Sequence, residues 1–130
     1  LVENEDLRQA RVLLATDQSP AGLEAAIRKL LAVRQTQDNA ALHRLLSSAY
    51  EAQHNRLRAL GHMYLAVQRS QTMAERSLSQ LSLAQLLSRL GHVQEACQTT
   101  QRLLREGSVP TGEIHVNAQA LLATLKCDGK

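Results

Sequence analysis

The sequence is 130 residues long, carries a formal net charge of +3, and contains no Phe or Trp and only two Tyr. A chain of this length can bury a core without disulfide or metal staples. Leucine and alanine are abundant and only two prolines interrupt, a composition that favours helices packed closely through Leu and Ala. Basic and acidic residues are interspersed, which is typical of solvated helix faces and argues against a nucleic-acid-binding stripe.

The two cysteines, Cys97 and Cys127, lack the spacing of metal ligands. We interpret them as packing residues of a protein from a reducing compartment rather than as a disulfide. No apolar run is long enough to span a membrane, and no segment resembles a signal peptide. The chain begins at Leu1 rather than at a methionine, so we expect it to be a fragment of a longer protein. These features predict an intracellular, cytoplasmic protein.

Apolar residues recur every three or four positions almost throughout the chain, which predicts seven helices. The first two form a hairpin over about residues 5–36, in which Ser19 caps the second helix and Pro20 occupies its first position. The second hairpin covers about residues 38–70, with Asp38 as the predicted cap. The apolar residues that recur along its second helix are Leu57, Leu60, Tyr64, Leu65 and Val67. We expect Ala59 and Ala66 to be small residues that let two helices touch.

The third hairpin covers about residues 72–106, where Thr72 and Glu75 form a capping box and Gly91 ends the first helix. Gly107 and Pro110 stop its second helix. A closing helix follows over about residues 112–126, capped by Thr111, with a main apolar stripe of Ile114, Ala118, Leu121, Leu122 and Leu125.

The closing helix also carries an apolar flank, Val116, Ala120 and Ala123, which a terminal cap should keep polar. Three readings stay open at this point. Another repeat follows in the full protein, or the flank meets a partner or a second copy, or it is buried in the same core.

The hairpins repeat along the chain. A shift of thirty-four residues places Leu23 on Leu57, and a shift of thirty-seven places Ala59 on Ala96. This pattern resembles the tetratricopeptide repeat family, whose unit is a thirty-four-residue helix–turn–helix. The best match lies in the third hairpin, at Leu83, Ala84, Leu87, Gly91, Val93, Ala96, Leu103 and Leu104.

The sequence departs from the family pattern in two respects. His54 stands where the second hairpin should have a glycine, and the usual tryptophan of the first helix is absent throughout. The resemblance implies one domain, residues 1–130, folded as a right-handed α-solenoid of three hairpins and a C-terminal capping helix. An irregular helical bundle and another kind of α-solenoid are the alternatives.

In such proteins the first helix of each hairpin lines a concave groove that binds a partner. Mapped onto this sequence, the resemblance implies a groove lined by Arg44, Ser48, Glu51, Leu81, Gln85, Ser88 and Arg89. Some family members grip carboxylate termini of chaperones with paired Asn and Lys. The matching positions here carry Ala10, Leu14, Arg44 and Ser48, so we expect no such activity.

Nothing in the sequence predicts catalysis, a metal or a cofactor. The histidines are His43, His54, His62, His92 and His115, and none falls in a recognised ligand spacing. We therefore expect a non-enzymatic protein-interaction module, a scaffold or adaptor that holds a helical or extended partner segment. Self-association is the alternative. RNA binding is a remote one, because the two tyrosines supply no stacking platform.

Overall fold

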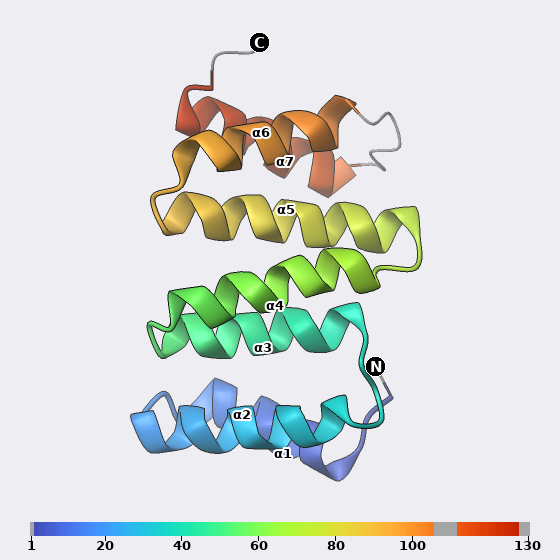
Figure 1. Cartoon of the computed structure of the whole chain (residues 1–130), viewed down its shortest axis with the longest axis vertical. Coiled ribbons are helices and arrows are strands. Elements are labelled where there is room, and N and C mark those ends of the chain that lie inside the picture. The colour runs from blue at the N-terminus through green and yellow to red at the C-terminus, as the bar shows by residue number, and fades with distance from the viewer. Residues whose placement is uncertain (1, 106–111, 128–130) are drawn as a thin grey trace. The chain divides into compact units, whose positions relative to one another are not determined.

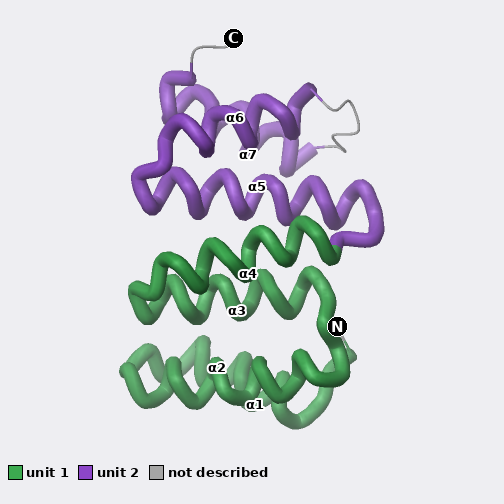
Figure 2. Tube along the Cα trace, viewed as in Figure 1, with its two compact units in different colours: residues 1–69 green, residues 70–130 purple. Residues whose placement is uncertain are grey.

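The computed structural model describes residues 2–105 and 112–127, and within them it is all α, with seven helices and no strand (Figure 1). The predicted all-α class and the number of helices are confirmed for these residues. The residues group into two compact units, 1–69 and 70–130 (Figure 2). The helices are α1 (Glu5–Thr16), α2 (Pro20–Arg34), α3 (Ala40–Ala52), α4 (Arg56–Arg69), α5 (Met73–Arg89), α6 (Val93–Arg105) and α7 (Gly112–Leu125).

Unit 1 contains α1 to α4, and each helix packs against the next one along the chain. Its core combines leucines with alanines, and the small side chains let neighbouring helices approach closely. Members with no exposed surface include Leu7, Ala10, Ala26, Leu30, Leu42, Leu46, Ala49, Ala59 and Ala66.

Unit 2 contains α5, α6 and α7, and α7 packs against both of the others. Leu81, Leu103 and Ala118, one from each helix, form a buried cluster against which Leu104 and Ile114 pack. The predicted stops at Gly107 and Pro110 and the Thr111 cap lie outside the described residues.

Most predicted helix starts are confirmed. The Ser19 hydroxyl accepts the Gly22 N–H at 3.1 Å, and the Thr72 hydroxyl accepts the Glu75 N–H at 3.1 Å. The Glu75 carboxylate accepts the N–H of Gln71 at 2.9 Å, rather than that of Thr72 as the capping box predicts. The Asp38 cap is wrong. Asn39 caps α3 by accepting the Leu42 N–H at 3.0 Å, since it is the residue with extended backbone just before the helix. Asp38 is thereby left to contact other side chains.

The turns inside the second and third hairpins match at a shift of thirty-seven residues. His54 and Gly91 both adopt the left-handed conformation, with φ of 62° and 84°. The next residue donates back to the helix in each case, Asn55 to the Tyr50 carbonyl at 2.9 Å and His92 to the Leu87 carbonyl at 2.8 Å. The predicted thirty-seven-residue register is therefore present in the backbone.

The predicted thirty-four-residue register between α2 and α4 is wrong. It pairs Leu23, which is 4 % exposed, with Leu57, which is 83 % exposed. A shift of thirty-six residues instead pairs the capping residues Ser19 and Asn55, and it pairs Leu23 with the buried Ala59. A two-residue error turns a helix by about 200°, which exchanges its inner and outer faces.

The predicted contact residues of α4, Ala59 and Ala66, are buried, but its larger apolar residues do not all face the core. The residues of α4 that are buried are Ala59, Met63 and Ala66, whereas Leu57 and Tyr64 are exposed. The buried Ser47 hydroxyl donates to the Ala59 carbonyl at 2.7 Å, so α3 contacts the small-residue side of α4. Large apolar side chains are left on its outer side.

Cys97 and Cys127 form a disulfide, with sulfurs 2.00 Å apart and Cα atoms 5.7 Å apart. This corrects their interpretation as separate packing residues. Disulfides belong chiefly to oxidising compartments, so the cysteines no longer support a reducing one. Among the described residues, no helix has the length and apolar character needed to cross a membrane.

Candidate functional site

The residues predicted to line a groove fall on α3 in unit 1 and on α5 in unit 2, so each set is considered by itself. On α3, Ser48 is exposed, while Arg44 and Glu51 are partly buried. On α5, Arg89 is exposed and Gln85 and Ser88 are partly buried. Leu81 is different, because it is 4 % exposed and packs against Leu103 and Ala118. Leu81 belongs to the core of unit 2 and is not a surface residue.

The apolar flank of α7 occupies the same register as these groove positions. Lys126 ends α7 with a φ of 55°, in the conformation of His54 and Gly91. Val116, Ala120 and Ala123 precede Lys126 by the same intervals at which Arg44, Ser48 and Glu51 precede His54. All three flank residues are exposed, Val116 by 61 %, so the reading that buries them in the core is wrong.

The outer face of α4 carries two large exposed apolar side chains. We define it as Leu57, Gly61 and Tyr64, which follow one another at intervals of four and three residues and so form one line along the helix. Leu57 is 83 % exposed and Tyr64 is 45 % exposed. A methyl group placed on Gly61 would meet no atom within 4 Å. This face therefore has an open gap between two large apolar side chains.

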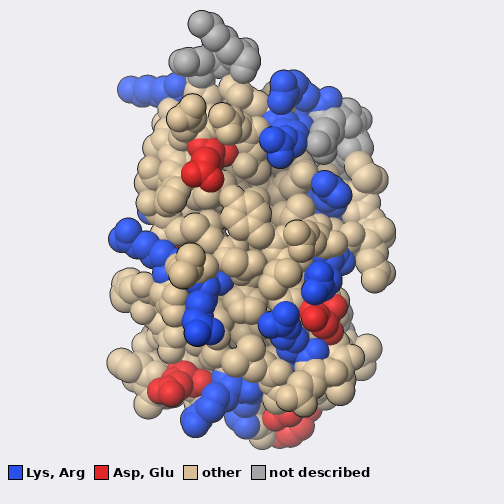
Figure 3. Space-filling model, in the orientation of Figure 1, with Lys and Arg blue, Asp and Glu red and all other residues tan. Residues whose placement is uncertain are grey.

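Cationic side chains flank the start of this outer face. Arg56 and Arg58 are exposed and lie about 100° to either side of Leu57 around the helix. The Arg58 guanidinium is 5.7 Å from the centre of the Tyr50 ring, a cation–π distance. Residues 56–69 include no acidic residue. Figure 3 shows that basic, acidic and uncharged side chains are otherwise interspersed over the face it draws.

The equivalent surface of α6 is polar. At the thirty-seven-residue register, the outer face of α4 corresponds to Gln94, Gln98 and Gln101, and Arg58 corresponds to Glu95. An acidic residue in the first turn suits the positive end of a helix dipole, whereas arginines there oppose it. The apolar and cationic character of α4 is therefore not a requirement of the hairpin fold.

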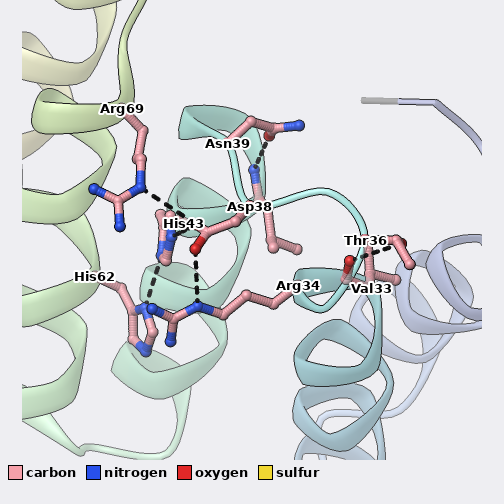
Figure 4. Close-up of polar contacts among 9 residues, drawn as sticks. Val33, Arg34, Thr36, Asp38, Asn39, His43, His62 and Arg69 are labelled. Carbon is pink, nitrogen blue, oxygen red and sulfur yellow. Dashed lines mark hydrogen bonds and ion pairs between the residues drawn. The ribbon is translucent and has the colours of Figure 1, made fainter.

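A histidine pair connects α3 and α4, with His43 buried and His62 partly buried (Figure 4). The Nδ1 atoms of His43 and His62 are 3.0 Å apart, and His43 Nε2 is 2.5 Å from an Asp38 carboxylate oxygen. Arg34 and Arg69 each place a guanidinium nitrogen 3.5 Å from the same carboxylate. His62 also stacks on the Tyr50 ring, with centroids 5.3 Å apart.

The hydrogen bonds define the protons of this pair. The hydrogen bond from His43, together with the nearby arginines, lowers the pKa of Asp38, which therefore acts as an acceptor. His43 must then donate from Nε2, and when neutral it accepts at Nδ1 from the N–H of His62. If His43 takes up one proton, its Nδ1 donates and the contact survives when His62 moves its own proton to Nε2. If both rings are protonated, both Nδ1 atoms carry a proton, and the contact between them breaks.

Burial governs the ionisation of both rings. Burial lowers the pKa of His43, and the Asp38 carboxylate opposes this only in part. Burial and the charge of His43, with Arg34 and Arg58 nearby, lower the pKa of His62 to about 4. Both rings are therefore neutral in the folded chain at pH 7.

The contacts of the histidine pair give it a structural role between α3 and α4. Both nitrogens of His43 are engaged, and the described residues contain no group of three or more potential ligands able to hold a metal ion. Sequence spacing could not reveal the pair, because its members lie nineteen residues apart on different helices.

A cavity of about 520 Å³ lies beside the disulfide, between α6 and the end of α7. Its wall is of mixed character, with polar Gln94, Gln98, Gln101 and Lys126 beside apolar Val93 and Leu125 and the two cysteines. Among the described residues that line it, Lys126 is the only charged one, so the cavity shows no catalytic constellation.

Comparison with known proteins identifies no relative, since no protein-family model, curated protein or solved structure matches the chain. Its function must therefore be argued from its own surfaces.

Proposed function

We propose that the chain is a non-enzymatic protein-interaction module, a scaffold or adaptor segment built from tetratricopeptide-like hairpins, that binds another protein. The observation that supports this most is the outer face of α4. Leu57 and Tyr64 are apolar and exposed, whereas the equivalent positions of α6 carry polar glutamines. Large apolar side chains aligned on an outer face are a feature of interaction sites.

The energetics favour covering this face. Burying a large apolar side chain such as that of Leu57 contributes about 1.5–3 kcal/mol. Tyrosine is enriched among the residues that dominate binding energy, because its ring combines apolar area with a polar hydroxyl. A glycine inside an exposed helix costs about 1 kcal/mol relative to alanine, a cost that Gly61 recovers when a partner approaches closely.

The residues predicted to line a groove form two further candidate surfaces, one on α3 in unit 1 and one on α5 in unit 2. Arg44, Ser48 and Glu51 on α3, and Gln85, Ser88 and Arg89 on α5, stay candidates for binding an extended or helical segment. Leu81 is removed from this set because it is buried. These surfaces and the outer face of α4 can be tested separately, because they involve different helices.

Self-association is the alternative function. The exposed apolar flank of α7 supports it, since Val116, Ala120 and Ala123 would let a second helix approach closely. RNA binding has less support. Tyr50 is only 6 % exposed, so Tyr64 is the one tyrosine available for stacking on a base.

Quantitative affinity enrichment from a cell extract tests the proposal. The whole chain is compared with Leu57→Gln/Tyr64→Gln, with Arg44→Glu/Arg89→Glu, and with the α6 control Gln94→Ala/Gln101→Ala. We expect proteins captured by the unaltered chain and the α6 control to be lost from the first variant. Loss from the second variant alone would move the site to the predicted groove. Equal capture by all four would contradict the proposal.

Sedimentation velocity of the isolated chain distinguishes self-association. A monomer at micromolar concentration contradicts the alternative. A dimer that dissociates on Val116→Lys replaces the proposed function by self-association.

A further inference from the structure

The outer face of α4 has the shape of a helix-packing site. Leu57 and Tyr64 project on either side of Gly61, where no atom lies within 4 Å of an added methyl group. Two helices approach most closely where a small residue on one lies between large residues that fit into grooves of the other. An extended strand binds through hydrogen bonds to free backbone groups of its partner. The backbone groups of α4 already bond to one another within the helix, so a strand is a poor fit for this face.

The charge around this face selects the partner. Arg56 and Arg58 flank Leu57 on both sides, and α4 has no acidic residue to neutralise them. Arg58 is held over the Tyr50 ring, which fixes its position before a partner arrives. A partner with carboxylates beside its apolar stripe would complement these cations, whereas one with lysines would be repelled.

Resting on the proposed function, we propose that the outer face of α4 binds an amphipathic helix of another protein, whose apolar stripe crosses at Gly61 and is flanked by acidic residues. A second copy of this chain is a poorer occupant. A symmetric pair of α4 helices would offer no carboxylate to Arg56 and Arg58, since residues 56–69 include no acidic residue.

Two synthetic peptides test the partner class directly. Both are about 20 residues long, enough for helix formation in a bound state. They share one Leu/Ala stripe and differ only in flanking residues, Glu in one and Lys in the other. Fluorescence anisotropy measures their binding to the whole chain, and amide chemical shifts map where they bind. We expect the acidic peptide to bind at least tenfold more tightly and to shift resonances of α4.

The first variant, Leu57→Gln/Gly61→Gln/Tyr64→Gln, gives the outer face of α4 the three glutamines found at the equivalent positions of α6. We expect it to reduce affinity for the acidic peptide at least tenfold. Because glutamine is a better helix former than glycine, this variant should unfold at no lower temperature than the unaltered chain. Gln94→Ala/Gln98→Ala/Gln101→Ala is the control and should bind normally. Arg56→Glu/Arg58→Glu should reverse the preference toward the Lys peptide.

Each opposite result overturns the inference. Equal affinity for both peptides excludes charge selection, and an equal loss in the α6 control excludes the outer face of α4. Binding of neither peptide, or preferential binding of a single-stranded RNA oligomer, excludes the acidic helix. If both peptides bind equally, or if neither binds, partner capture that depends on Leu57 and Tyr64 would still support the proposed function. Failure of the acidic-helix inference can therefore be distinguished from failure of the proposed function.

Discussion

The α3–α4 and α5–α6 hairpins share a backbone design and differ in almost everything outside it. His54 and Gly91 occupy the same left-handed position, and the hydrogen bonds around them correspond pair by pair. Ala59 and Ala96 are both fully buried at equivalent places. The hairpin is thus determined by its turn and by a few small inner residues. The residues of the outer faces are not constrained by the hairpin fold and can differ between the two hairpins.

The two hairpins differ at their outer positions and at the positions between their helices. The α4 helix has Leu57, Gly61 and Tyr64 where α6 has glutamines, and Arg58 where α6 has Glu95, whereas Arg56 corresponds to Val93. Between the helices, His43 and His62 of unit 1 correspond to Gln80 and Thr99 of unit 2. Unit 2 instead has the disulfide. These differences predict that the two hairpins respond differently to reductant, to acid and to exchange of single residues.

The largest effect should follow loss of the disulfide. The Cys97–Cys127 link closes a loop with a sequence separation of 30 residues, for which the chain-entropy model gives about 3–4 kcal/mol. Urea unfolding with and without dithiothreitol should show this loss, and hydrogen exchange should locate it in unit 2. The Cys97→Ser/Cys127→Ser variant should be insensitive to reductant. Two free thiols in the unreduced chain would contradict the pairing.

Acid should destabilise unit 1 through the histidine pair. The folded pKa of His62 is about 4, below its usual 6.5, so between these values the unfolded chain binds a proton that the folded chain does not. Stability should therefore fall as the pH drops from about 6.5 to about 4, by on the order of 2 kcal/mol. The lowered pKa of His43, whose neighbours include Asp38, Arg34 and Arg69, acts in the same direction.

Replacing His43 and His62 by the residue types at the equivalent positions of unit 2 tests whether the histidine pair causes this pH dependence. His43→Gln/His62→Thr should flatten the stability profile between pH 6.5 and pH 4, measured by urea unfolding. His115→Gln, at an exposed position of α7, should leave the profile unchanged. An unaltered slope in the double variant would show that other groups cause the dependence.

Exchanging the turn residues should have a smaller, reciprocal effect. A non-glycine residue in the left-handed region costs about 1–2 kcal/mol, partly offset by the greater freedom of glycine in the unfolded chain. His54→Gly should therefore stabilise the chain by about 0.5–1 kcal/mol, and Gly91→His should destabilise it by a similar amount. Thermal unfolding of both variants measures this. Destabilisation by His54→Gly would mean that the imidazole makes a compensating contact.

The smallest effect belongs to the outer faces. Leu57→Gln should change the free energy of unfolding by less than about 0.5 kcal/mol, because Leu57 is 83 % exposed. The reciprocal Gln94→Leu should be similarly neutral. Chemical denaturation of both variants is the measurement. A loss above 2 kcal/mol for Leu57→Gln would place this residue in a core and remove the main support for a binding face.

Local signals made much of the fold predictable from the sequence. Ser19, Pro20, Thr72 and Gly91 act within one turn of a helix, so their roles could be read from adjacent residues. The thirty-seven-residue register was likewise predictable, because the second and third hairpins share small residues at matching inner positions.

The errors came from interactions that no local pattern contains. The repeat pattern predicted that Ala59 and Ala66 lie at a helix contact, but only the close approach of α3 to that side reveals that Leu57 faces outward. The disulfide depends on how α7 packs against α6. The histidine pair depends on α3 and α4 meeting. The candidate groove was inferred from a family resemblance, and Leu81 was misplaced because its contacts with α6 and α7 cannot be read from its own helix.

The turn at the end of α7 has a consequence for protein engineering. Lys126 is left-handed, and the Cys127 N–H donates to the Leu122 carbonyl at 3.3 Å, as Asn55 and His92 donate to their own helices. The chain leaves α7 in the conformation that elsewhere introduces a second helix. A designed helix that is fused after residue 127 would therefore begin from the same backbone conformation as α4 and α6.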